Sequence, residues 1–547
     1  MDGRLIIANK RIETSEKIAS LNPATLESIG DACLASKEVC LEAVQAAKKA
    51  FPLWRSLSFD EKKKILKQAK KILLRRCSET ACLITVEKGS PLPESLSVEV
   101  LSCLEALDFY AHDLKNTLRP KKVKPSVPFF SHKKNFFQFQ PLGITLIISP
   151  WNFPFMIPFF DTLSALVAGN VVILRPSTTT PFTALLIGEI FLEAGLPPGV
   201  LNIVNCRVPQ AEAMITNPDV QTVLFTGSVD VGKRIMELGS RNLTNTILEL
   251  GGKDPMIVLK DADLERAARG AVWAGYMNCG QSCASIERVY VAKEVVDEFM
   301  NKVLTLTKEL KVGNPLEPDV DLGPMANLSQ LQIVEDHIQD ARAKGAQVLY
   351  GGKRLEVLPG YFLEPTILLK VNHFMKVMKD ETFGPVLPLM IFSEPEEAVS
   401  LANDSRYGLT ASVWTRDKKM ARWVAEQLEA GSVTVNDHMF SFTEPKAIWG
   451  GIKQTGLGRS HGPYGLEELV NIKFTSLDFL NKKSQLWWYP YSRPKPQVIE
   501  KSLILLHHER LKEKIKALFS LLSHWSIVQA GTPFRNFIKI GSRFFRK

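Results

Sequence analysis

Short apolar segments alternate with helical segments between Gly143 and Gly252, and this alternation constrains the fold more than any other feature. The runs GITLIIS, VVILR, LNIVN and TVLFTG have the length of buried strands, and amphipathic stretches such as FDTLSALVAGN and TALLIGEIFLEAG separate them. Strand–helix–strand units at this spacing predict a parallel, doubly wound sheet. Such a sheet binds ligands, most often nucleotides, beyond the carboxyl ends of its strands.

The flanking regions have other patterns. The apolar spacing of residues 37–118 predicts a helical layer. Residues 121–140 are basic, aromatic and contain prolines, which predicts an extended arm. Strand and helix patterns return from Gly252 to about Gly450. We therefore expect an α/β fold with two doubly wound domains and a small β oligomerisation arm. The expected divisions are a dinucleotide-binding domain of residues 1–118 and 142–251, a catalytic domain of residues 252–450, oligomerisation or bridging segments 119–141 and 451–481, and a basic, helical C-terminal extension 482–547.

Positive charge is concentrated at the end of the chain. Residues 482–547 contain fourteen Lys or Arg and three acids, a net of +11, whereas the whole chain carries +10. The rest is close to neutral, which makes nucleic acid an unexpected partner. The eight cysteines have no paired or metal-ligand spacing, and no apolar run has the length of a transmembrane helix. We expect reduced thiols, no metal and a cytoplasmic protein.

Two segments contain a nucleophile and a base. The segment Asn278-Cys-Gly-Gln-Ser-Cys283 places a thiol after a glycine-containing turn, and a thiolate attacks carbonyl carbon when a base takes its proton. The segment Leu248-Glu249-Leu250-Gly251-Gly252 places a carboxylate at the end of an apolar strand, where partial burial raises its pKa toward that of a general base. Taken alone, each residue is more often a buried free cysteine or a surface charge.

Two further turns follow strands. In Pro150-Trp-Asn152-Phe-Pro154 the amide of Asn152 can donate to an oxygen that becomes negative when a nucleophile adds to a carbonyl. Phe225-Thr-Gly-Ser-Val-Asp-Val-Gly232 leads from a strand into a helix, where backbone N–H groups can receive phosphate.

Together these segments resemble the NAD(P)-dependent, non-acylating enzymes of the aldehyde dehydrogenase superfamily. The resemblance extends over about residues 22–479 and includes Glu381-Thr-Phe-Gly-Pro-Val386, Asn436 and Gly456-Leu-Gly-Arg459. It implies oxidation of an aldehyde to a carboxylic acid with NAD or NADP, through a hemithioacetal and a thioester on Cys283, in a homodimer or homotetramer. A family-fold binding or structural protein without activity is the rival hypothesis, which the complete motif set disfavours.

The resemblance also implies residue roles. Cys283 is the nucleophile, Glu249 the base for thioester hydrolysis, Asn152 with the Cys283 N–H the oxyanion hole, and Lys253 stands beside the base. Most family members carry Glu at the position of Thr178, where it repels a 2′-phosphate. Because this chain has Thr178 there, with Arg175 nearby, NADP is an expected cofactor as well as NAD. The implied cofactor-binding residues are Ser149, Pro150, Trp151, Asn152, Arg175, Ser177, Thr178, Gly227, Ser228, Val231, Leu250, Gly251, Gln330, Glu381 and Phe383.

The positions implied to line the substrate tunnel are mostly apolar and favour a hydrophobic aliphatic or aromatic aldehyde. They are Phe155, Met156, Phe159, Trp273, Met277, Phe440 and Phe442. Core packing is the alternative meaning of this aromatic spacing. Succinate-semialdehyde dehydrogenase is the alternative activity, but its carboxylate-binding arginines would fall at Phe160 and Met277 and its second redox cysteine at Ser285, and none is matched.

The extension after Leu480 predicts a long helix from Val498 to about Val528. Its apolar stripe comprises Leu511, Ile515, Leu518, Leu522 and Trp525, beside the basic residues Arg510, Lys512, Lys514 and Lys516. The stripe either packs on the enzyme or on a sister subunit, or lies in an anionic membrane surface on the inner face of a membrane.

Overall fold

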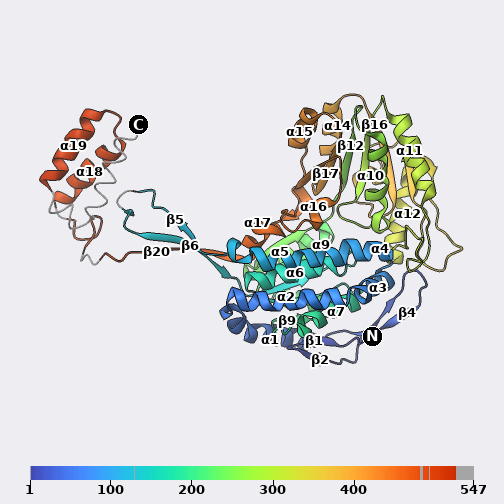
Figure 1. Ribbon diagram of the computed structural model, residues 1–547, viewed down its shortest axis with the longest axis horizontal. Helices are drawn as coiled ribbons and strands as arrows, with labels where there is room; N and C mark the ends of the chain where they lie inside the picture. Colours follow the sequence, from blue (N-terminus) through green and yellow to red (C-terminus); the bar gives the residue numbers. More distant parts are fainter. Residues whose placement is uncertain (1, 128–129, 481–483, 492, 525–547) are drawn as a thin grey trace. The chain divides into compact units, whose positions relative to one another are not determined.

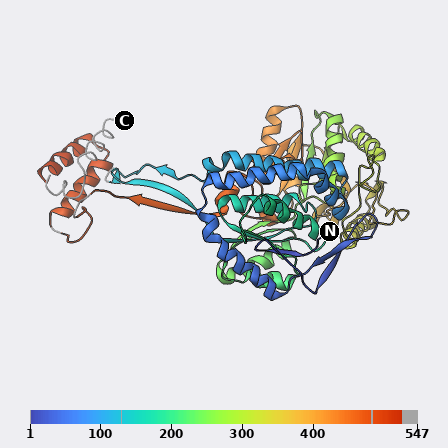
Figure 2. The same ribbon diagram turned by 60° about the horizontal axis from the view of Figure 1, so that its bottom comes forward.

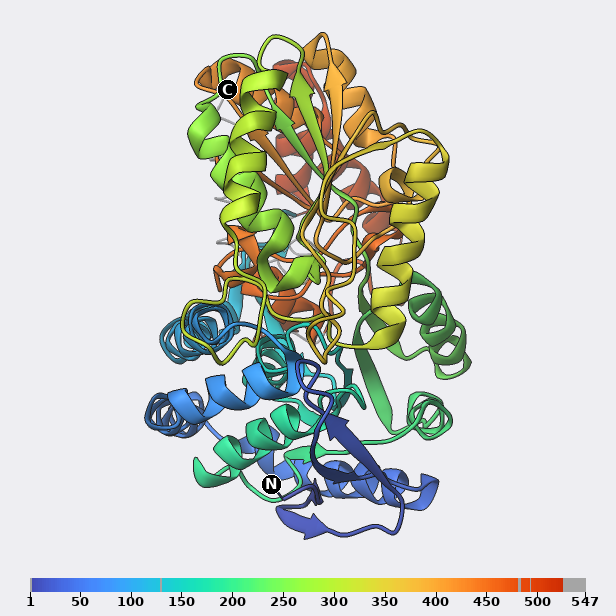
Figure 3. The same cartoon turned by 90° about the vertical axis from the view of Figure 1, so that its right-hand side faces the viewer.

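The computed structural model describes residues 2–127, 130–480, 484–491 and 493–524, with the backbone alone for residues 113–116. The chain divides into two compact units, Met1–Thr117 with Pro141–Val470, and Leu118–Gln140 with Asn471–Lys547. The first unit contains two α/β parts, each built on its own sheet (Figures 1 and 3). None of the described helices is both long and apolar enough to cross a bilayer.

The first sheet has the strand order β19-β11-β10-β7-β8-β9-β1-β2. Its central strands β11, β10, β7, β8 and β9 are parallel to one another, the outer strands β19 and β1 pair antiparallel with β11 and β9, and β7 is buried along its whole length. Burial on both faces explains the continuous apolar runs in the sequence. The bounds are β1 Leu5–Ile7, β2 Lys10–Ile12, β7 Ile144–Ile148, β8 Val171–Arg175, β9 Leu201–Ile203, β10 Val220–Thr226, β11 Asn245–Glu249 and β19 Gly456–Leu457; the separate hairpin has β3 Lys17–Leu21 and β4 Ser28–Cys33.

The helices of this part include two whose amino ends are held by buried carboxylates. Glu99 accepts the backbone N–H groups of Phe155 and Met156 at the start of α6, and Glu87 accepts that of Phe182 in α7. Helix dipoles favour a negative charge there. The bounds are α1 Lys37–Ser56, α2 Phe59–Arg75, α3 Cys77–Lys88, α4 Leu92–Glu94, η1 Ser95–Val100, α5 Leu101–Thr117, α6 Met156–Ala168, α7 Pro181–Glu193, α8 Val208–Ile215, α9 Val229–Gly239 and η3 Ser240–Asn242.

The second sheet has the order β14-β15-β16-β13-β12-β17-β18, and all its pairs except β14 with β15 are parallel. Its strands are β12 Asp254–Val258, β13 Ile286–Ala292, β14 Gln347–Tyr350, β15 Thr366–Leu369, β16 Val386–Phe392, β17 Thr410–Trp414 and β18 Ser432–Val435. The helices are α10 Leu264–Tyr276, η4 Met277–Gly280, α11 Val296–Glu309, α12 Leu328–Ala343, α13 Lys376–Lys379, α14 Pro395–Asn403, α15 Lys418–Gln427, α16 Phe440–Thr443, η5 Lys453–Thr455 and α17 Gly462–Glu468.

The strand order of the first sheet fixes where a ligand can bind. The chain runs outward from β7 through β8 to β9, and then returns to the other side of β7 with β10 and β11. A crevice therefore forms beyond the carboxyl ends of β7 and β10, at the topological switch point. The register pairs Phe225 with Ile148 and Thr226 with Glu249, so the turns after all three strands meet there.

In the second unit, the described residues form a three-stranded sheet in the order β20-β6-β5 and the helices α18 and α19 (Figure 2). Apolar residues from the segment before the helices and from both helices form its small core, namely Leu486, Val498, Leu505, Ala517 and Leu521. The bounds are β5 Lys121–Val123, β6 Lys134–Pro141, β20 Val470–Leu477, α18 Pro494–His507 and α19 Leu511–Ser523.

Two expectations about the end of the chain are wrong. The single helix predicted from Val498 to Val528 is instead α18 and α19, because folding back at residues 508–510 lets the two helices bury apolar residues against each other. The predicted stripe is not the packed face: Leu511, Ile515 and Leu522 are exposed, Leu518 is partly buried, and Trp525 lies outside the described residues.

The expected bridging segment 451–481 is split between the two units. Its first part stays with the first unit, because β19 pairs with β11, and only residues from Asn471 onward join the second unit.

Candidate active site

The two large sheets of the first unit contribute to one site. Strands β7, β10 and β11 end at it, and strands β12, β13 and β16 begin near it. The segments between these strand ends contain Asn152, Glu249, Lys253, Cys283 and Phe383, so residues far apart in the sequence come together.

A cavity of about 290 Å³ lies at the switch point, and its lining fits a dinucleotide. The ring of Trp151 contacts that of Phe383 edge-on, with 5.6 Å between centroids, and Ser228 caps α9, whose free N–H groups can receive phosphate. Ten predicted cofactor residues line it, joined by Thr226, Glu249, Cys283 and Ile333; the ten are Pro150, Trp151, Asn152, Gly227, Ser228, Leu250, Gly251, Gln330, Glu381 and Phe383.

The carboxylate of Glu381 is fixed at the edge of this cavity. Its Oε1 accepts the N–H of Gly252 at 2.9 Å. A Cβ at Gly251 would lie 2.4 Å from Glu381 Oε2, so a larger residue there would displace the carboxylate from this position. Burial raises the pKa of Glu381 to about 8, with a further contribution from the nearby carboxylate of Glu287.

Lys253 does not line the cavity but supports the loop that carries Phe383. Its Nζ lies 2.5 Å from Glu287 Oε2 and 3.0 Å from Thr382 Oγ1, and the side chain is buried. Glu287 accepts the N–H groups of Thr382 and Phe383, each at 2.8 Å, while Gln330 donates to their carbonyl oxygens at 3.0 and 3.2 Å. This network holds Phe383 in a left-handed conformation, φ 54°, which costs energy outside glycine.

The nucleophile loop is tied directly to Asn152. Asn278 adopts the left-handed conformation, φ 58°, and its Nδ2 donates to the Asn152 carbonyl at 2.9 Å. Asn152 Nδ2 donates in turn to the Gln281 carbonyl at 3.2 Å. From beneath, Glu94 accepts the Asn278 N–H and Ser90 donates to its Oδ1, each at 3.0 Å. The amide and the thiol are therefore held in one rigid arrangement.

The electrostatic surroundings of Cys283 oppose ionisation. The side chain is partly exposed to the cavities, yet burial raises the pKa of the thiol above its ordinary value. The carboxyl groups of Asp254, Glu381 and Glu249 raise it further, in that order. A resting thiol of this kind is neutral and must give its proton to a base before it attacks.

Glu249 has the properties of a general base that can activate water. Its side chain is 5% exposed, and neither carboxylate oxygen has a hydrogen-bond partner among the described residues. Burial raises its pKa to about 8, against the lowering influence of Ser460 and Arg459. A carboxylate with this pKa accepts protons effectively near neutral pH.

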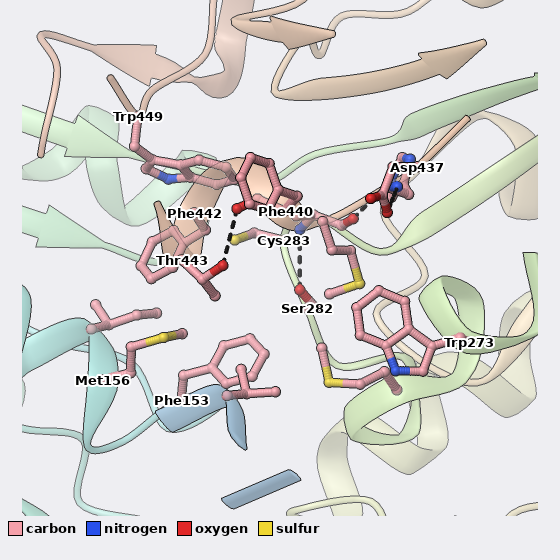
Figure 4. A pocket seen from close by; sticks show the side chains of 16 residues that line it. Phe153, Met156, Trp273, Ser282, Cys283, Asp437, Phe440, Phe442, Thr443 and Trp449 are labelled. Carbon is pink, nitrogen blue, oxygen red and sulfur yellow. Dashed lines mark hydrogen bonds between the residues drawn. The ribbon is translucent and has the colours of Figure 1, made fainter. Parts of the chain in front are cut away.

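A second cavity, of about 240 Å³, meets Cys283 from another side (Figure 4). Aromatic side chains surround it, and Trp273 and Phe440 are 49% and 56% exposed, which leaves them free to contact a ligand. Met156, Trp273, Met277, Phe440 and Phe442, all predicted, line it. The other lining residues are Val98, Phe153, Ile157, Ser282, Ala284, Asp437, His438, Met439, Thr443 and Trp449.

Several predicted residues lie elsewhere. Phe155 and Phe159 are fully buried and stack on each other at 5.3 Å, so they belong to the core and not to the aromatic cavity. The guanidinium of Arg175 donates to the Cys206 carbonyl at 2.8 and 3.1 Å. The two N–H groups that were expected to bind a phosphate therefore already have a partner. Ser149, Ser177, Thr178 and Val231 also lie outside the lining of the dinucleotide cavity.

Other residues of the site were missed. Glu287 and Asn278 hold the site in place through hydrogen bonds to the backbone of other residues. The one feature of the sequence that could have indicated Glu287 is an acidic residue inside an apolar strand. The aromatic wall formed by Phe153 and Trp449 was also missed, although Phe153 stands inside the quoted segment 150–154.

Comparison with known proteins identifies the same family. Residues 11–475 match the profile of the Aldehyde dehydrogenase family. The chain is 36% identical to aminoaldehyde dehydrogenase 2 of Pisum sativum, over 89% of this chain and 96% of that one. It is 36% identical to the NADP⁺ succinate-semialdehyde dehydrogenase of Escherichia coli, over 84% and 94%. The NAD⁺ complex of an aldehyde dehydrogenase from Bacillus cereus superposes with a TM-score of 0.84 at 31% identity, covering 87% and 96%.

Proposed function

Because the chain belongs to the aldehyde dehydrogenase family and oxidises an aldehyde with NAD or NADP, we propose that it does so through a thioester on Cys283. One observation carries the proposal: Cys283 lines both the dinucleotide cavity and the aromatic cavity, so one sulfur reaches cofactor and substrate. Replacement by alanine should abolish aldehyde oxidation and leave folding and cofactor binding intact. Activity within tenfold of the wild type would contradict the assignment.

In the proposed first half-reaction, the Cys283 thiol gives its proton to solvent water, and the sulfur bonds to the aldehyde carbon. The oxygen that becomes negative is stabilised by Asn152 Nδ2 and the Cys283 N–H, which are donors that the Asn278 hydrogen bonds hold in place. A nicotinamide dinucleotide, when bound, accepts the hydride. Trp151, Glu381 and Phe383 would hold it at the edge of the cavity.

In the second half-reaction, water hydrolyses the thioester. Glu249 removes a proton from the water, the new C–O bond forms, and the C–S bond breaks to release the carboxylic acid and Cys283. The experiment that separates the halves is Glu249→Gln, described in the Discussion.

For the substrate, we propose a hydrophobic aliphatic or aromatic aldehyde. The lining of the aromatic cavity, all of it in the described part of the chain, includes no Lys or Arg to pair with a carboxylate. The three positions that distinguish succinate-semialdehyde dehydrogenases differ too: Phe160 is buried against His461, Met277 lines the cavity, and Ser285 donates to the Ala274 carbonyl. A semialdehyde with a carboxylate tail would enter this cavity without a partner.

An aminoaldehyde is the second candidate, favoured by a specific observation. The same cavity contains Asp437 beside Trp273, Phe440 and Trp449, and a cationic tail is attracted both to a carboxylate and to aromatic faces. A relative from Pisum sativum is named for such a substrate. Comparing 4-trimethylaminobutanal with butanal distinguishes the two candidates.

The helix α19 supports a further proposal, that the enzyme contacts an anionic membrane surface on the cytoplasmic side. Leu511, Ile515, Phe519 and Leu522 lie on one face of α19 and are 58%, 39%, 67% and 47% exposed. The cations Lys512 and Lys514 lie beside them in the helix, and basic residues near an anionic leaflet contribute about 1 kcal/mol each. The polar and apolar faces together are typical of an interfacial helix.

Sedimentation with vesicles tests this surface. The wild type should sediment with phosphatidylserine vesicles at low salt, and not with phosphatidylcholine vesicles. The double variant Ile515→Glu/Phe519→Glu should bind at least tenfold more weakly, while Val357→Glu, which is 91% exposed in the first unit, should bind unchanged. If the wild type stays in the supernatant, the membrane proposal is wrong. The expected homodimer or homotetramer is tested separately by the particle mass in solution.

A further inference from the structure

A third cavity, much smaller than the other two and adjoining both, also reaches Cys283. Its volume is about 10 Å³, which is the size needed for one water molecule. Its polar lining includes Glu249, Asp161, Thr226, Ser460 and His461. The sulfur of Cys283 thus lies where substrate, cofactor and a single enclosed water can all approach it.

Unpartnered polar atoms surround this cavity. Both carboxylate oxygens of Glu249, Oδ2 of Asp161 and Nδ1 of His461 are buried, and none has a hydrogen-bond partner among the described residues. Their side chains are 5%, 3% and 1% exposed. A buried polar atom left unpaired is destabilising, so four at one small cavity indicate an ordered water that bonds to them.

From this arrangement we propose that Asp161 and His461 are positioning residues that, with Glu249, hold the water that hydrolyses the Cys283 thioester. The inference rests on the proposed function, because it concerns its second half-reaction. Glu249 accepts one proton of the water, and the carbonyl oxygen of the Asp161 carboxyl accepts the other. The oxygen lone pair of the water then points toward the acyl carbon on Cys283.

The charge states of the surrounding groups agree with these roles. Burial, and secondarily the carboxylate of Glu249, raises the pKa of Asp161 well above its ordinary value, which favours the protonated acid with its carbonyl oxygen free to accept. Burial lowers the pKa of His461 to about 3, and its neutral ring lies 4.7 Å from the rings of both Phe160 and Phe442. These ring contacts fix the imidazole at the cavity wall.

The proton balance of the step is complete. The water oxygen bonds to the acyl carbon while one water proton passes to Glu249, and the second stays on the carboxylic acid product. The C–S bond breaks and leaves a thiolate on Cys283. Glu249 returns its proton to that sulfur, which regenerates the neutral thiol and the carboxylate. Asp161 keeps its own proton throughout.

Isosteric variants at Asp161 test the role. Asparagine keeps a neutral carbonyl acceptor, so Asp161→Asn should keep steady-state turnover within about threefold of the wild type. Leucine removes the acceptor, so Asp161→Leu should lower steady-state kcat at least tenfold while keeping a burst of reduced cofactor of one per active site. An external thiol, which takes the acyl group from Cys283 by thioester exchange and leaves the Cys283 thiol, should restore turnover in Asp161→Leu. Thr162→Val, a buried neighbour on α6 outside the three cavities, serves as the matched control and should behave as the wild type.

The outcomes separate this inference from the proposed function. If the wild type shows no aldehyde-dependent burst, the proposed function fails. If the wild type shows the burst but Asp161→Leu turns over normally, or Asp161→Asn is as slow as Asp161→Leu, the positioning role is wrong. A crystal structure of the wild type gives an answer even if Asp161→Leu does not fold: we expect a water bonded to Glu249, Asp161 and His461 Nδ1, and a dry cavity overturns the inference.

Discussion

Lengthening an unbranched aldehyde should raise kcat/KM until the chain fills the aromatic cavity. The lining is apolar over most of its surface, with Met156, Trp273, Phe440 and Phe442 among its walls. Each buried methylene contributes about 0.8 kcal/mol. Two more methylenes, from butanal to hexanal, contribute about 1.6 kcal/mol if fully buried, which corresponds to about fifteenfold in kcat/KM.

The assay is initial-rate formation of reduced cofactor with butanal, pentanal, hexanal and octanal, with NAD and with NADP. Succinate semialdehyde has the same four-carbon skeleton as butanal with a terminal carboxylate, so it is the matched control for charge. We expect it to be the poorer substrate, because a carboxylate in this cavity has no cation to pair with. A flat series of rates, or a kcat/KM for succinate semialdehyde above that for butanal, would refute the reasoning.

Three other predictions concern single residues. Glu249→Gln should give a burst of reduced cofactor close to one per active site followed by slow turnover, and an equally slowed burst would show that Glu249 is needed before hydrolysis. In the wild type the hydrolytic rate should rise about tenfold per pH unit below 8 and level off above it, because the pKa of Glu249 is raised to about 8 and only the carboxylate accepts a proton; a rate independent of pH between 6 and 8 would contradict this. Thr178→Glu should lower kcat/KM with NADP by about tenfold relative to NAD, the effect of about 1.4 kcal/mol of added repulsion, and an unchanged ratio would show that residue 178 does not contact the adenosine ribose.

Much of the fold could be predicted because local patterns determine it. The alternation after Gly143 is a direct consequence of parallel strands buried on both faces. The family resemblance, which rests on the motifs, is confirmed by the match over residues 11–475. The tail shows the limit. Helical spacing from Val498 onward is the same for one helix or two, and the break at residues 508–510 depends on Ala517 and Leu521 finding partners in α18.

The site shows a similar division. Cys283, Glu249 and Asn152 each lie in a short motif that can be recognised in the sequence, and the structure brings all three to one cavity. Phe155 and Phe159 share their spacing with Met156, but α6 turns them into the core, and sequence spacing alone does not tell one face from another. The role proposed for Asp161 and His461 depends on a cavity between α6, β11 and the turn before α17, which only the folded chain forms. No local pattern indicates such a junction.

The central claim is that the acyl group is carried by Cys283, and intact-protein and peptide mass spectrometry test it most directly. The variant Glu249→Gln should be mixed with hexanal and cofactor and quenched in acid within the burst. We expect a hexanoyl adduct on the peptide that contains Cys283, with a stoichiometry close to one per active site, and none in Cys283→Ala/Glu249→Gln. Reduced cofactor formed without any adduct, or an adduct on Cys279 in place of Cys283, would contradict the account.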